Sequence, residues 1–177
     1  ALEQEVRRLL AWEAYCLDRK LWDDWLALFS DDAEYWAPAW ATEEEVTSDP
    51  GRELSLIYLR GKGGIQDRIF RIRARDSLAS VPLDRTAHVL TEPVITKVEA
   101  HQVEAGCSWI THVYSQRGIA TLGGYTDYLF HRDPDGLKIS RKRVVLIDDR
   151  LDAAGVRVRH AANQPVGHLV IGGVHQR

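Results

Sequence analysis

"QVEAGCSWITHVYSQ" (102–116) carries the pattern that decides the fold, because its apolar and polar residues alternate over most of its length. Alternation places successive side chains on opposite faces of a strand, whereas a helical face repeats every 3.6 residues. The same period runs through "RTAHVLTEPVITKVEA" (85–100), "YTDYLFHR" (125–132) and "LKISRKRVVLID" (137–148). The stretch "DPDG" (133–136) between the last two is typical of a hairpin. The sequence from residue 85 onward therefore predicts an antiparallel sheet.

Three stretches within the first 75 residues show a helical period instead. Residues 2–19 place apolar residues at i, i+3 and i+4 with Glu3, Arg7, Arg8 and Glu13 between them, which predicts an amphipathic helix. A second helix is expected over 21–29, ended by the turn-forming residues 30–32. A third is expected after a glycine-rich turn at 61–64, with Ile65, Ile69 and Ile72 on one face.

Short strands are expected at "AEYWAPAW" (33–40) and "ELSLIYL" (53–59), on either side of an acidic, solvated loop (41–51). Pro38 cannot donate to a strand ladder, so it must lie at an edge, a bulge or a strand end. Helices followed by antiparallel strands predict an α+β fold with the helices on one face of the sheet.

Length and composition indicate one globular domain spanning residues 1–177, with 45% hydrophobic and 28% charged residues. We find no apolar run of membrane-spanning length, and the amphipathic N-terminus does not resemble a signal peptide. These features predict a cytoplasmic protein that does not enter a membrane. The segment 152–177, rich in Ala, Gly, Val and His, shows weak periodicity and is left unassigned.

The net charge of −3 argues against a nucleic-acid partner, which selects clustered positive charge. The most basic run, "KISRKRVV" (138–145), reads as a strand. Strict alternation would place Arg141 and Arg143 on one face and Lys138 and Lys142 on the other, so its cations are split.

The sequence contains no recognisable metal or cofactor motif. The seven histidines form no H-x3–5-H pair, and the nearest group is His160, His168 and His175 in the C-terminal segment, where we expect solvated side chains. Cys16 and Cys107 are expected to be small buried hydrophobes. No P-loop, dinucleotide fingerprint or nucleophile elbow is present.

An acid–base site remains possible, because a sheet backed by helices can enclose a pocket. The candidates are His88, Asp32, Tyr35 and Asp127, the last sharing a strand face with Tyr125. Such a set would suit a stand-alone dehydratase or isomerase. For His88, and equally for His112, the favoured interpretation is a buried histidine hydrogen-bonded to a neighbour.

Five of the six tryptophans lie within the first 40 residues. Trp22 and Trp25 fall on the predicted second helix beside Leu21 and are expected in the core. Trp36 and Trp40 flank Pro38 on an irregular strand, and alternation places them on the same face. Since aromatic residues are enriched at protein interfaces, Trp36 and Trp40 are the candidates for contact with a partner subunit.

Five stretches in this order resemble the small (β) subunit of aromatic-ring-hydroxylating dioxygenases, over about residues 3–150. They are "DRKLWDDWLALFSDDAEYWAPAW" (18–40), "RELSLIY" (52–58), "DRIFRIR" (67–73), "RTAHVLTEPVI" (85–95) and "DGLKISRKRVVLIDD" (135–149). The first of them, with its acidic loop and "SLIY", is most similar to the benzoate, toluate and anthranilate branch. Beyond about residue 150 the chain departs from the family pattern.

The resemblance implies a cone-shaped α+β fold with a strongly curved antiparallel sheet, as in nuclear transport factor 2 and cystatin-like proteins. It implies a large α subunit as partner, in an α3β3 assembly, holding a Rieske [2Fe–2S] cluster and a mononuclear non-haem iron. Electrons would come from NADH through a reductase, and the substrate would be a single-ring aromatic carboxylate bound by the α subunit. The β subunit would be structural, with no catalytic residue, cofactor or metal of its own.

Overall fold

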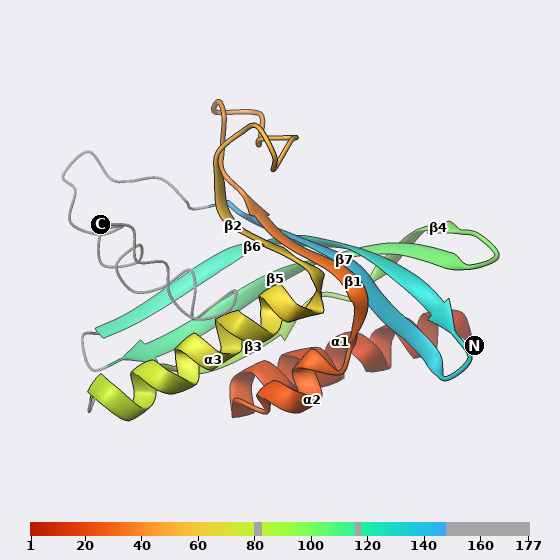
Figure 1. Ribbon diagram of the computed structural model, residues 1–177. Helices are drawn as coiled ribbons and strands as arrows, with labels where there is room; N and C mark the ends of the chain where they lie inside the picture. Colours follow the sequence, from red (N-terminus) through yellow and green to blue (C-terminus); the bar gives the residue numbers. More distant parts are fainter. Residues whose placement is uncertain (80–82, 116–117, 148–177) are drawn as a thin grey trace.

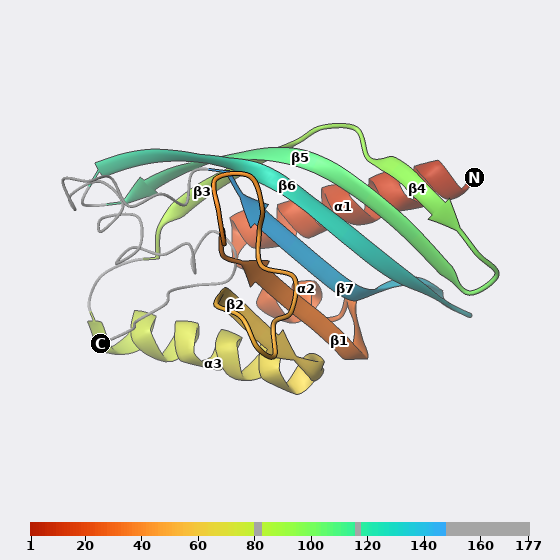
Figure 2. The same ribbon diagram turned by 90° about the horizontal axis from the view of Figure 1, so that it is seen from above.

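The computed structural model describes residues 1–79, 83–115 and 118–147 (Figure 1). In chain order the elements are α1 (Leu2–Arg19), α2 (Trp22–Leu26), β1 (Phe29–Pro38), β2 (Ser55–Arg60), α3 (Gly61–Ala79), β3 (Arg85–Leu90), β4 (Val94–Val98), β5 (Gln102–Ser115), β6 (Gly118–Asp133) and β7 (Gly136–Leu146). The strands form a sheet in the order β2-β1-β7-β6-β5-β3, and β4 also pairs with β5. The sheet is strongly curved and the helices lie on one of its faces (Figures 1 and 2). The predicted α+β class is confirmed.

The helix predictions hold, with changes at the ends of α2 and at the start of α3. Helix α1 has the predicted bounds, but α2 ends at Leu26 because Phe29 already begins β1. Residues 30–32 therefore do not stop a helix; they lie within β1, in the register shift between Phe29 and Glu34 where the pairing with β7 is irregular. The glycines at 61–64 belong to α3 itself, which begins at Gly61 with a φ of 72°.

The sheet is mixed rather than wholly antiparallel. Strand β1 runs parallel to β7, with Tyr35 opposite Lys142, while the other pairs are antiparallel. A parallel pair needs a long crossover, and here the whole segment from β2 to β6 supplies it. The predicted hairpin between β6 and β7 is confirmed, with Asp133 opposite Gly136.

A bulge in β7 changes which charged residues face the core. Phe130 pairs with Ile139 and Leu129 with Arg141, so Ser140 has no opposite residue and the alternation shifts by one. Leu137 and Ile139 point inward before the bulge, and Lys142 and Val144 do so after it. The prediction that Lys138 and Lys142 share a face is therefore wrong. Lys142 is 5% exposed, whereas Lys138 reaches the carbonyl of Ala27.

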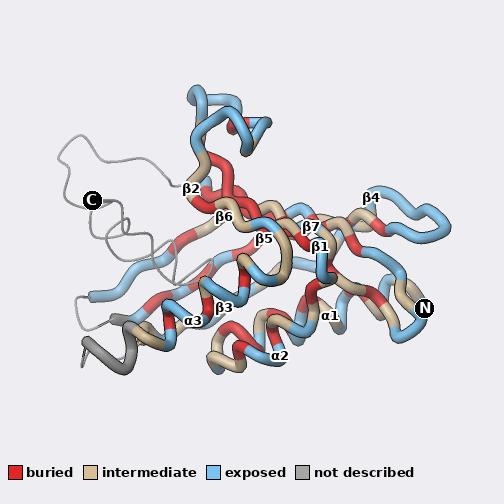
Figure 3. Tube along the Cα trace, in the orientation of Figure 1, coloured by how far each residue is buried: buried red, intermediate tan, exposed pale blue. Residues whose placement is uncertain are grey.

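The core lies between the helices and the concave face of the sheet, as the burial pattern in Figure 3 shows. Trp25 is fully buried and meets Trp22, Phe29 and Tyr35 edge to face, with ring centroids 4.8–6.5 Å apart. Helix α3 contributes Ile65, Ile69 and Ile72, each at most 3% exposed. The core assignments of Trp22 and Trp25 are confirmed.

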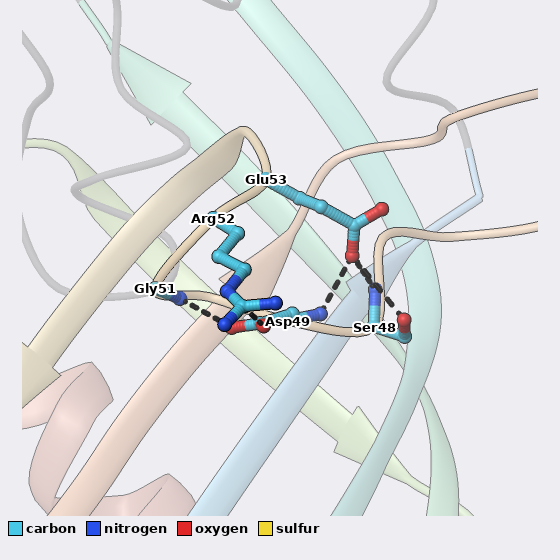
Figure 4. Close-up of polar contacts among 5 residues, drawn as sticks. All are labelled: Ser48, Asp49, Gly51, Arg52 and Glu53. Atoms are coloured by element: carbon cyan, nitrogen blue, oxygen red, sulfur yellow. Dashed lines mark hydrogen bonds and ion pairs between the residues drawn. The ribbon is translucent and has the colours of Figure 1, made fainter.

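The loop between β1 and β2 stands clear of the sheet on the side away from the helices (Figure 1). Hydrogen bonds to its acidic residues hold the loop in shape (Figure 4). The Glu53 carboxylate accepts hydrogen bonds from the backbone amides of Ser48 and Asp49, at 2.7 and 2.6 Å. These bonds lower the pKa of Glu53 below its usual value. Asp49 accepts from the amide of Gly51. The loop is exposed but has a defined conformation.

Candidate functional site

A single buried carboxylate, Glu13 on α1, joins four elements of the fold. Its Oε1 accepts hydrogen bonds from Lys142 Nζ on β7, at 2.6 Å, and from Trp25 Nε1 on α2, at 3.2 Å. Its Oε2 accepts from the hydroxyl of Tyr128 on β6, at 2.8 Å. Glu13 is 2% exposed and Lys142 is 5% exposed, so the ion pair is shielded from solvent. The placement of Glu13 on the polar side of α1 was wrong.

Two tyrosines enclose the ammonium group of Lys142. Its Nζ lies 5.6 Å from the ring centroids of both Tyr35 and Tyr128, within cation–π range. Burial raises the pKa of both tyrosine hydroxyls well above the usual value, and the nearby charge of Glu13 raises them further. Both hydroxyls are therefore neutral at physiological pH and act only as hydrogen-bonding groups.

His88 on β3 is fixed by Asp18 at the end of α1. Its Nδ1 lies 2.5 Å from Asp18 Oδ1, and its backbone amide donates to Oδ2 at 3.0 Å. Thr86 donates to the same carboxylate, and Lys20 donates to Thr86. Burial would raise the pKa of Asp18, but the hydrogen bonds and charge of His88, with the Thr86 bond, lower it below its usual value. The expected hydrogen-bonded His88 is thus present, with its side chain 9% exposed.

Behind His88 lies a small chamber against the concave face of the sheet. It is lined by Glu13, Ala14, Leu17, Tyr35, His88, Leu90, Trp109, Thr111, Thr126, Tyr128, Lys142 and Val144. It leaves about 30 Å³ for the centres of water-sized molecules. Gly124 opposite Trp109 makes room for the indole, since a Cβ there would lie 2.8 Å from the ring. The chamber is far smaller than a typical ligand pocket of about 300–1,000 Å³.

The structure does not bring the predicted acid–base residues together. His88 and Tyr35 both line the chamber. Asp32 lies on an exposed part of β1, where its side chain accepts a hydrogen bond from Ser30. Asp127 lies on the outer face of the sheet, 3.0 Å from Arg143, where it lines a separate hollow with Arg141. No proton could pass directly among all four side chains in this arrangement.

Trp36 and Trp40 occupy different environments. Trp36 is 8% exposed, donates to Ser55 at 2.9 Å and lies under the guanidinium of Arg143. Trp40 is half-buried and donates to the carbonyl of Leu146 at 2.6 Å, at the base of the β1–β2 loop. A register shift between Ala37 and Pro38 interrupts the strand between them. Their assignment to a partner surface stays a prediction.

The remaining candidates divide between the core and the surface. Cys16 and Cys107 are buried as expected, and burial raises the pKa of the Cys107 thiol to about 11. His112, expected to be buried, is exposed on the outer face beside Thr121. Within the described residues, no three His, Cys, Asp or Glu side chains are placed to hold a metal ion. His160, His168 and His175 lie outside the described residues.

Sequence reasoning missed Glu13, Lys142 and Asp18. A helical wheel places Glu13 four residues from Leu9 and from Leu17, which is a signal that it lies near the buried face. Lys142 carries no such signal, because the bulge at Ser140 decides its direction. Asp18 and His88 are 70 residues apart and meet only through folding.

Removing one partner of the buried Glu13–Lys142 ion pair should lower the stability of the fold. We expect Lys142→Met to destabilise the chain by about 3–5 kcal/mol, because it leaves the Glu13 charge buried without its counterion. Glu13→Gln keeps the side-chain shape, so Glu13→Gln/Lys142→Met should lose at least about 1 kcal/mol less than the two single losses combined. Urea unfolding measures each variant. Lys97→Met, in the exposed Lys97–Glu99 pair, is the matched control and should leave the midpoint unchanged; additive losses would contradict the coupling.

Acid should weaken the α1–β3 contact through Asp18. Because the pKa of Asp18 is lower in the folded chain than its usual 3.8, its stabilising contribution is complete above the unfolded pKa and is lost as pH falls through the folded one. We expect Asp18→Asn to be less stable at neutral pH and to show a shallower loss of stability on acidification to about pH 2.5. Urea midpoints across this range measure the slope. Asp24→Asn, at an exposed position on α2, should retain the wild-type slope.

Comparison with known proteins finds small (β) subunits of ring-hydroxylating dioxygenases among the relatives of this chain. The family model for the ring hydroxylating beta subunit matches residues 12–153. The 2-halobenzoate 1,2-dioxygenase small subunit of Burkholderia cepacia is 35% identical over 77% of this chain and 83% of its own. The crystal structure of the benzoate 1,2-dioxygenase β subunit of Burkholderia mallei is 30% identical, covers 85% of this chain and 95% of that one, and has a TM-score of 0.70.

The fold has wider relatives. A Novosphingobium aromaticivorans protein described as NTF2-like with a cystatin-like fold is 20% identical, with a TM-score of 0.58 over 86% of this chain and 84% of its own. This likeness confirms the predicted fold class. No helix among the described residues is long and apolar enough to cross a membrane. From the family match and its benzoate-type relatives, we conclude that this chain belongs to the ring-hydroxylating dioxygenase β-subunit family.

Proposed function

We propose that this chain is the non-catalytic small subunit of a dioxygenase that adds O2 to a single-ring aromatic carboxylate. Its role is to hold the large α subunits in an active assembly, α3β3 in composition, in the cytoplasm. The α subunit supplies the Rieske [2Fe–2S] cluster, the mononuclear iron and the substrate pocket, and a reductase delivers electrons from NADH. The family match over residues 12–153, with relatives named for benzoate and 2-halobenzoate, carries the proposal.

The geometry of the chamber supports a structural role. Its space, about 30 Å³ for water-sized centres, is too small for an aromatic ring. The His88, Asp32, Tyr35 and Asp127 set proposed for a dehydratase or isomerase is divided between the two faces of the sheet and the exposed part of β1. The four residues predicted for a stand-alone enzyme are therefore not assembled around one pocket.

The outer face of the sheet carries an exposed apolar patch that suits assembly. We define the outer patch as five residues with exposed fractions of 44–68%: Val89, Ile110, Tyr114, Ile119 and Ile147. Val89 pairs with Ile110 and Tyr114 with Ile119, so the two side chains of each pair are neighbours on the face away from the helices, with His112 and Thr121 between the pairs. Contiguous exposed apolar surface marks protein-interaction sites. The large subunit is the partner that we assign to this patch.

Of the two tryptophans assigned to the partner surface, Trp40 is the stronger candidate. Trp36 offers little accessible surface, since it is 8% exposed beneath Arg143. Trp40 is half-buried at the base of a loop that extends away from the sheet (Figure 1). A half-exposed indole with one satisfied hydrogen bond can bury its remaining surface against a partner without losing that bond.

Assembly can be tested directly. The chain is purified alone and co-expressed with its cognate large subunit, and mass and iron content are measured for each preparation. We expect a hetero-oligomer of two polypeptides in equal number, with iron confined to the larger one. A stable homodimer that does not associate with the large subunit would contradict the proposal. Iron bound by this chain alone would contradict its non-catalytic role.

The interface assignment can be tested with matched variants. Ile110→Lys/Ile119→Lys should weaken association at least about tenfold, or about 1.4 kcal/mol, because it places charge in a desolvated contact. Trp40→Ala should cost about 2 kcal/mol or more of association, and Trp36→Ala less. Val94→Lys/Val98→Lys on β4, also exposed, is the control and should associate normally. Light scattering of the co-expressed complex measures association, and thermal unfolding of the isolated chain separates lost contacts from misfolding.

A further inference from the structure

Two polar groups that line the chamber have no hydrogen-bond partner in the protein. They are Trp109 Nε1 and Thr111 Oγ1, which belong to neighbouring inward-facing positions of β5. Trp109 is 8% exposed and Thr111 is fully buried, so bulk solvent does not reach them. Leaving such a group unpaired in the interior costs about 1–3 kcal/mol, and native proteins pair nearly all of them. We therefore expect these two groups to hydrogen-bond to a molecule bound in the chamber, which the Glu13–Lys142 pair also lines.

Lys142 adds further unused hydrogen-bonding capacity to the same space. An ammonium group carries three N–H donors, and the hydrogen bond to Glu13 uses one of them. The rings of Tyr35 and Tyr128 attract its charge at 5.6 Å, but they replace no conventional acceptor. The chamber therefore contains hydrogen-bond donors without acceptors, which the oxygen atom of a small bound molecule can satisfy.

We propose that the chamber is a hydration site that holds about two ordered water molecules as part of the native fold. A buried water needs about 10–15 Å³ for its centre and 2–4 polar partners, and the chamber offers about 30 Å³. The waters link Trp109 Nε1 and Thr111 Oγ1 to the Glu13–Lys142 pair. The ion pair is electrically neutral, so the occupant has no charge to compensate, which favours water over an anion.

The waters reach the chamber from a wider hollow between α1 and the β3–β4 edge. This hollow has about 400 Å³ of solvent-accessible space and shares Ala14, His88 and Leu90 with the chamber. His88, held by Asp18, lies at the boundary between the two spaces. The chamber waters therefore exchange with solvent past His88 rather than through the sheet.

The direction in which one substitution changes the melting temperature tests the proposal. Thr111→Val removes the hydroxyl and keeps a β-branched shape. In a hydrated chamber it removes a partner of the water and lowers the melting temperature by roughly 2–4 °C. In a dry chamber it removes an unsatisfied buried group and raises the melting temperature instead. Thr121→Val, at an exposed position on β6, controls for the change in strand propensity.

A high-resolution crystal structure of the full chain supplies the second measurement. We expect density for water within hydrogen-bond distance of Trp109 Nε1 and Thr111 Oγ1 in the wild type, and loss of at least one water in Thr111→Val. An empty chamber, or a rise in melting temperature beyond that of Thr121→Val, would overturn the proposal. Continuous density of a larger molecule extending past His88 would overturn it as well, because the site would then bind a ligand other than water.

Discussion

The hydrogen-bonded ion pair of Glu13 and Lys142 is the constraint on which the rest of the structure depends. One carboxylate ties α1 to β7 directly, to β6 through Tyr128 and to α2 through Trp25. Hydrophobic packing alone would tolerate small shifts of a helix across the sheet, because it is not directional. Three donors that converge on two oxygen atoms tolerate far less. A buried pair of this kind is weak evidence for stability but a strong determinant of position.

The position of Lys142 depends in turn on one unpaired residue in β7. Without the bulge at Ser140, alternation would keep Leu137 and Ile139 inward and direct Lys142 to the outer face. Glu13 would then be a buried charge with no counterion. The bulge also sets Arg143 on the outer face, over Trp36 and against Asp127. A single inserted residue thus provides a counterion inside and orders the charged side chains outside.

This dependence explains how much the sequence could predict. The period of two and the period of 3.6 are local, so most helices and strands, the α+β class and the Trp22–Trp25 core follow from the residues directly. The parallel β1–β7 pair, the Ser140 bulge and the Asp18–His88 contact depend on segments far apart in the chain. Residues 30–32 illustrate the limit: their composition favours a turn, but they lie within β1 between two positions that pair with β7, Phe29 and Glu34. At the chamber, His88 and Tyr35 were among the candidates named from the sequence, whereas Glu13, Lys142 and Asp18 were not.

The two faces of the sheet differ in character: the concave face holds paired titratable groups, and the convex face exposes apolar side chains. On the concave face the titratable groups are paired: Glu13 with Lys142, Asp18 with His88, and two tyrosines whose pKa values burial raises. Groups held in this way fix geometry, and moving a proton among them would break the contacts that position the helices. On the convex face, half-exposed isoleucine, valine and tyrosine side chains remain at neighbouring positions of β3, β5 and β6. Exposed apolar surface is a liability for an isolated chain and becomes stabilising once a partner covers it. The paired groups on the concave face therefore hold the helices in place, and the exposed apolar residues on the convex face are the surface that we assign to the partner.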